Sequence, residues 1–186
     1  MNQETWSKSL LQAYTTLPML TKIIDRSNMS EALGSFSYAG DTMDTVRAIL
    51  NNNKRKEALI NAKVIVDNAL ASMKPALKRV LELKYLRKMK CEDIAKVDGI
   101  SLRNVFRRQS LALQAFSKYC ATKGYDCQWL EERYGKEQIF IKLNERISAK
   151  VERREKKLAN ESNKHQATKI DIGRCRSLGY DGATFA

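Results

Sequence analysis

Two apolar stripes at helical spacing and a glycine dominate the middle of the chain, between Met73 and Phe116. The first stripe is Val80, Leu81, Leu83 and Tyr85, with Pro75 in its opening turn, and the second is Ile94, Ala95 and Val97. A glycine can adopt the left-handed conformation that ends a helix, so Gly99 predicts a sharp turn. Ser101 then stands where a helix N-cap belongs. The stretch therefore predicts a helix-turn-helix.

The next helix is expected to begin at Leu102 and to separate charged from apolar side chains. Its first two turns hold Arg103, Asn104, Arg107 and Arg108, and its apolar residues are Val105, Ala112 and Phe116. Arg and Asn can hydrogen-bond guanine or adenine in the major groove, where the N-terminal residues of a recognition helix lie. We therefore expect one face of this helix to pack and the other to meet DNA.

An ungapped pattern joins these elements. It is carried by Lys74-Pro75, Val80 to Tyr85, Asp93-Ile94-Ala95, Gly99-Ile100-Ser101, Val105, Arg108 and Ala112. At these residues the chain resembles region four of bacterial sigma factors and the region-four-like regulators of phages and mobile elements. The resemblance implies an all-α domain that binds double-stranded DNA.

This hypothesis divides the polar residues into two groups. Base readout is assigned to Ser101, Arg103, Asn104, Phe106, Arg107 and Arg108, with Phe106 on a thymine methyl. Phosphate contacts are assigned to Lys84, Arg87, Lys88 and Lys90.

Two positions depart from the family pattern. Asp98 replaces a buried leucine, so we expect its carboxylate to turn to solvent and Val97 to shift inward, and Lys88 replaces a frequent glycine.

The charge of the chain favours a polyanionic partner. With 34 basic and 21 acidic residues, the net charge is +13 and the pI about 9.7. Nucleic acid is the first candidate. A membrane partner is not expected, because there is neither a run of about 18 apolar residues nor a basic amphipathic helix with aromatic residues. The N-terminus lacks the layout of a signal peptide, so we expect a cytoplasmic protein.

The residue types that carry catalysis or bind metals are sparse. The cysteines at 91, 120, 127 and 175 form no CxxC pair, and His165 is the one histidine. Motifs for phosphate-binding loops, HExxH metal sites and nucleophile elbows are also missing from the sequence. We expect no enzyme, no cofactor and no metal site, and we interpret Cys91 and Cys120 as small buried residues.

The first 72 residues predict packing helices. Residues 5–25 favour one or two amphipathic helices, with Pro18 at a break or in a new first turn. Residues 28–44 are typical of loop or weak helix, and Phe36 to Ala39 resemble, over four residues only, the DNA-melting part of sigma region two. A helix over 56–72 would close the core of the helix-turn-helix. Asn51 to Asn53 mark the expected domain boundary.

Beyond Phe116 the recognition helix is expected to reach Thr122, with Gly124 after its C-cap. Residues 129–147 then predict a hairpin of two short helices or one kinked helix, whose aromatic residues favour core packing over base stacking. Leu143, Ile147, Val151 and Leu158 form a thin stripe in a charged segment. A solvated helix is favoured there over a coiled-coil seam that would join a homodimer.

Together these predictions describe an all-α protein with four parts. They are an N-terminal helical segment (1–53), a helix-turn-helix DNA-binding domain (54–123), a C-terminal helical extension (124–160) and a flexible tail (161–186). The favoured function is sequence-specific DNA binding and transcription regulation. One alternative is a small divergent sigma factor that recruits core RNA polymerase, and another is a protein-interaction module that binds the polymerase or an anti-sigma partner.

Overall fold

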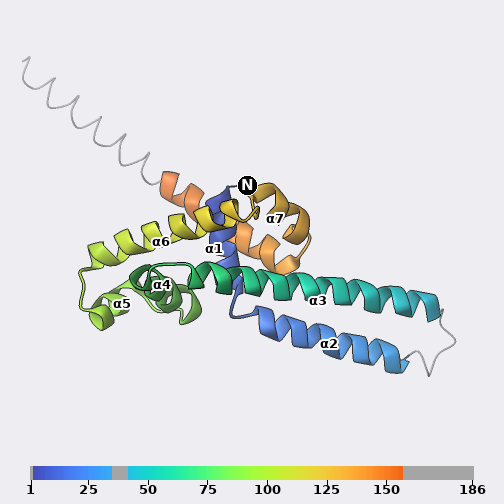
Figure 1. Ribbon diagram of the computed structural model, residues 1–186. Helices are drawn as coiled ribbons and strands as arrows, with labels where there is room; N and C mark the ends of the chain where they lie inside the picture. The colour runs from blue at the N-terminus through green and yellow to red at the C-terminus, as the bar shows by residue number, and fades with distance from the viewer. Residues whose placement is uncertain (1, 35–41, 157–186) are drawn as a thin grey trace, which may run out of the picture. The chain divides into compact units, whose positions relative to one another are not determined.

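The computed structural model describes residues 2–34 and 42–156, and every regular element in that part is helical (Figure 1). The expected all-α fold is confirmed. The elements are α1 (Gln3–Ala13), α2 (Leu17–Gly34), α3 (Thr42–Ala71), α4 (Pro75–Leu81), the π-helical η1 (Glu82–Leu86), α5 (Cys91–Asp98), α6 (Leu102–Thr122) and α7 (Cys127–Tyr134). A further helix covers residues 138–156. The chain divides into two compact units, residues 1–145 and residues 146–186.

The N-terminal region forms two helices rather than one. Asn2 caps α1, because its side-chain oxygen accepts a hydrogen bond from the Glu4 backbone N–H at 3.2 Å. Pro18 lies in the first turn of α2, where its missing N–H costs nothing. Helix α2 runs on to Gly34, so residues 28–34 are helical. Residues 35–41, with the segment Phe36 to Ala39, lie outside the described part.

Helix α3 is longer than the sequence predicted. It begins at Thr42 instead of near residue 56, so the expected boundary at Asn51 to Asn53 falls within one helix and within one compact unit. The asparagines are tolerated because α2 lies beside this part of α3 (Figure 1). Asn28 Nδ2 donates to Asn53 Oδ1 at 2.9 Å, which satisfies a polar group that would otherwise disfavour helix.

One large core joins the two ends of the first unit. Its largest fully buried side chains include Trp6, Tyr134, Phe116, Phe140, Leu10, Leu11, Leu17, Leu59, Leu81 and Leu130. Trp6 and Tyr134 each pack against the Phe140 ring, with centroid distances of 5.8 and 5.2 Å. The prediction that the C-terminal aromatic residues pack in a core is confirmed for Tyr134 and Phe140. A turn at Gly135-Lys136 makes this region a hairpin of two helices.

Candidate nucleic-acid interface

A small separate core holds the helix-turn-helix together. Leu83 from η1, Ile94 from α5 and Val105 from α6 form it, and each is at most 5% exposed. Met89, Cys91, Ala95 and Ile100 pack around these three. Each helix thus contributes one buried aliphatic side chain, so the orientation of α6 depends on all three elements.

The turn into α6 has the predicted geometry. Gly99 ends α5 in the left-handed conformation, with φ 62° and ψ 31°, and its N–H donates to the Ala95 carbonyl. Ser101 is extended, and its Oγ accepts a hydrogen bond from the Asn104 backbone N–H at 3.3 Å. These two residues end one helix and begin the next within three positions, so the chain bends sharply between them.

The side chains assigned to base readout lie outside both cores. Ser101, Arg103, Asn104 and Arg107 are exposed, Phe106 is 54% exposed, and Arg108 is half-buried. None of the three arginines forms an ion pair with a residue in the described part of the chain. Val105 is completely buried on the opposite side of α6. The first two turns of α6 therefore present unneutralised guanidinium groups to solvent.

The residues assigned to phosphate contacts lie in η1 (Lys84) and in the loop between η1 and α5 (Arg87, Lys88 and Lys90). Arg87, Lys88 and Lys90 are exposed, and Lys84 is half-buried. Lys88 has a φ of 56°, the left-handed conformation for which the resemblance leads us to expect glycine. Lys88 thus has a backbone conformation that favours glycine, and its exposed side chain places a cation at the surface of this loop.

Residues 84–108 are strongly basic. They contain eight basic and three acidic residues. One of the acids is Asp98, which is neutralised by Arg79 from α4. The others, Glu92 and Asp93, lie in the first turn of α5, where a helix dipole favours negative charge. The segment that ends in the first turns of α6 therefore carries an excess of positive charge.

Asp98 and Val97 overturn one expectation. The Asp98 side chain is only 8% exposed and accepts a hydrogen bond from Arg79 Nε at 2.7 Å, whereas Val97 is 56% exposed. The expectation that Asp98 turns to solvent and Val97 turns inward was wrong. A cation supplied by α4 compensates for the burial of the carboxylate, and a partner 19 residues away leaves no local signal in the sequence.

Sequence reasoning also missed a polar chain that links the three elements. Gln109 Nε2 donates to Tyr85 Oη at 3.5 Å, and Cys91 Sγ donates to Gln109 Oε1 at 3.7 Å. Burial raises the pKa of Tyr85, so its hydroxyl stays protonated near neutral pH. Cys91 is half-buried rather than buried, whereas Cys120 is buried and burial raises its pKa to about 12.

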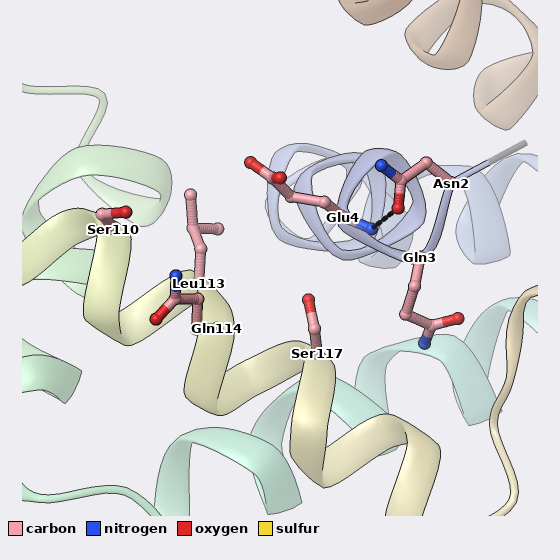
Figure 2. Close-up of a pocket in the computed structure, with 7 residues that line it drawn as sticks. All are labelled: Asn2, Gln3, Glu4, Ser110, Leu113, Gln114 and Ser117. Atoms are coloured by element: carbon pink, nitrogen blue, oxygen red, sulfur yellow. Dashed lines mark hydrogen bonds between the residues drawn. The ribbon is translucent and has the colours of Figure 1, made fainter.

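The exposed face of α6 is bounded by the start of α1. Figure 2 shows Gln3 and Glu4 of α1 across a recess from Ser110, Gln114 and Ser117 of α6. The recess has a volume of about 270 Å³. Farther along, the Ser7 and Ser117 hydroxyl groups are 2.8 Å apart. The turns of α6 before Ser110 are therefore less obstructed by α1 than those after it.

Neither a metal-binding cluster nor a membrane-spanning helix occurs among the described residues. No three His, Cys, Asp or Glu side chains there lie close enough to share a metal ion, and each helix is too short or too polar to cross a membrane. Comparison of the chain with family models, curated proteins and solved structures gave no match.

Proposed function

We propose that this protein binds double-stranded DNA sequence-specifically through the N-terminal turns of α6 and regulates transcription. The observation that carries the proposal is that Arg103 and Arg107, one helical turn apart, are exposed and have no acidic partner in the described residues. Their position just after a capped and sharply turned helix start is the one from which a recognition helix reads bases. The resemblance to sigma region four supports the same function.

The two groups of polar residues have different tasks under this proposal. Arg103, Asn104, Arg107 and Arg108 hydrogen-bond base edges, since bidentate Arg–guanine and Asn–adenine pairs discriminate by about 1–3 kcal/mol each. Ser101 and Phe106 complete the readout surface. Lys84, Arg87, Lys88 and Lys90 neutralise phosphates, which raises affinity for every sequence and fixes the orientation of α6.

A titration of labelled random duplexes over a salt series tests DNA binding. We expect the logarithm of the association constant to fall linearly with the logarithm of salt concentration, by about 0.9 per phosphate contact. Selection from a random pool should then yield an enriched site. No binding at low salt would refute the proposal and would favour the protein-only alternative, which capture of core RNA polymerase would support. Run-off transcription with that polymerase distinguishes a regulator from a divergent sigma factor.

A further inference from the structure

Helix α3 carries a second apolar stripe, on a face that contacts neither core. Its members recur at alternating steps of three and four residues and are Met43, Val46, Leu50, Asn53, Glu57, Ile60 and Val64, here called the α3 seam. The five apolar members are between 43% and 57% exposed, and Asn53 and Glu57 are exposed as well. This is the heptad spacing of a coiled coil, kept over three heptads.

The core of the first unit does not account for this stripe. The residues that α3 gives to the core are Ala58, Leu59, Ala62, Ile65, Val66, Ala69 and Leu70. Between Thr42 and Glu57 α3 buries no residue, although α2 lies beside it. A surface helix needs only one apolar stripe to pack on its own core, so a second stripe indicates a second packing partner. The pair α2 and α3 alone also buries too little to be stable between Thr42 and Glu57, which favours a further helical layer there.

We propose that the α3 seam pairs antiparallel with the same seam of a second copy of this chain. A twofold axis at the level of residue 55 places Leu50 opposite Ile60 of the second copy, and Val46 opposite Val64. The polar members then fall together, with Asn53 opposite the second copy's Glu57. Within its own chain Asn53 also accepts a hydrogen bond from Asn28, and Glu57 pairs with Arg133. A twofold interface must be complementary to itself, and between residues 46 and 64 this register pairs apolar with apolar and polar with polar members.

Charge at the edges of the seam permits self-association. Three of the flanking cations are already paired within the chain: Arg47 with Asp44 at 2.9 Å, Lys56 with Asp25 at 2.5 Å and Lys63 with Asp67 at 2.7 Å. These acids reduce the repulsion that two basic helices would otherwise suffer. Lys54, which has no ion pair within the described residues, lies at the twofold axis close to the second copy's Glu57, a carboxylate that Arg133 of its own chain already partly neutralises at 3.6 Å.

The seam is short for a permanent interface. It spans 22 residues, roughly 33 Å at 1.5 Å per residue, and offers fewer side chains than the roughly 20–30 a side of a standard interface. We therefore expect a reversible equilibrium between monomer and dimer. This surface is separate from the C-terminal helix expected from the sequence, and the proposal does not depend on DNA binding.

Sedimentation equilibrium of the full chain over a concentration series tests the proposal. The wild type should shift from monomer to dimer mass, and Leu50→Glu and Ile60→Lys should each weaken the dimer by roughly tenfold or more, because each buries an unpaired charge. Met29→Glu is the matched control, since Met29 is 67% exposed on α2 and outside the seam, and it should leave the equilibrium unchanged. Circular dichroism checks that all variants keep their helix content.

Mixing the two charged variants tests the register. In the antiparallel arrangement the glutamate introduced by Leu50→Glu in one chain meets the lysine introduced by Ile60→Lys in the other. On the other side of the twofold axis, the unchanged Ile60 of the Leu50→Glu chain meets the unchanged Leu50 of the Ile60→Lys chain. The equimolar mixture should therefore recover a heterodimer. A parallel arrangement would leave both charges unpaired. A monomeric wild type at every concentration, or charged variants that dimerise like the wild type, would overturn the proposal, and failure of the mixture to recover a dimer would overturn its register.

Discussion

The N-terminal turns of α6 and the α3 seam are both exposed, yet they differ in whether their cations form ion pairs with acidic residues of the chain. On α6, Arg103 and Arg107 have no acidic partner among the described residues, whereas Arg47, Lys56 and Lys63 beside the seam each have one. Unpaired cations attract a polyanion, and paired cations allow apolar side chains to meet. The difference in acidic partners is therefore consistent with the DNA binding that we propose for α6 and with the self-association that we propose for the seam.

Removal of the unpaired cations should have the largest effect. We expect Arg103→Ala combined with Arg107→Ala to weaken specific DNA binding by a factor on the order of 100 or more, because each arginine contributes about 1–3 kcal/mol. Fluorescence anisotropy with the selected site measures this. Lys118→Ala removes an exposed cation from a later turn of α6 and is the control. Equal losses for the two proteins would show that charge on α6 acts without regard to position.

The turn that aims α6 should be sensitive to a single methyl group. A Cβ at residue 99 would meet no atom within 4 Å, so Gly99→Ala isolates the strain of the positive φ. It should lower the free energy of unfolding by about 1–2 kcal/mol in urea titrations.

Gly34→Ala is the matched control, because its Cβ also meets open space but its φ is not positive. It should leave stability unchanged or raise it, since alanine favours helix. A Gly99→Ala protein as stable as this control would contradict the role given to the turn.

Lys88 offers a way to separate stability from binding. Lys88→Gly relieves a φ of 56° but adds backbone entropy to the unfolded chain, so the free energy of unfolding should rise by up to about 1 kcal/mol. DNA affinity should fall at the same time, because a phosphate contact is lost. Urea titration and anisotropy on the same preparation measure both. A variant that loses stability would show that the lysine conformation is not strained.

The smallest effect concerns the paired cations. Burial pushes the pKa of Asp67 upward, but hydrogen bonds from Lys63 and Tyr14 outweigh it and lower the pKa below 3.8. The stability from this carboxylate is thus present above pH 3.8 and lost as the pH falls through the lowered pKa.

At neutral pH, Asp67→Asn should free Lys63 and weaken the dimer roughly two- to threefold. Sedimentation equilibrium that shows no change would mean that pairing at this flank does not matter.

Much of the fold near the turn could be predicted from the sequence, because its signals are local. Gly99, Ser101 and Gly124 each determine a helix end through their own backbone or side chain, and all three lie where the pattern placed them. The exposure of Arg103 and Arg107 follows in the same way from the spacing of Val105 and Ala112. The DNA-binding roles of these residues remain predictions.

Features that depend on distant partners could not be predicted in the same way. Asp98 is buried because Arg79 reaches it from another helix, and α3 passes through three asparagines because α2 lies beside it. The α3 seam could not be predicted for a different reason. Its heptad spacing is visible in the sequence, but only the buried face of the same helix shows that the core leaves the seam uncovered.

The central claim is that the first turns of α6 read bases while the loop before α5 holds phosphates. The most direct measurement is the ratio of affinities for the selected site and for random DNA, for Arg107→Ala and Lys90→Ala beside the wild type. Arg107→Ala should reduce the difference in binding free energy between specific and random DNA by about 1–3 kcal/mol and relax preference at one base. Lys90→Ala should weaken both affinities equally and leave their ratio unchanged. Equal losses on specific and random DNA for Arg107→Ala would contradict the assignment.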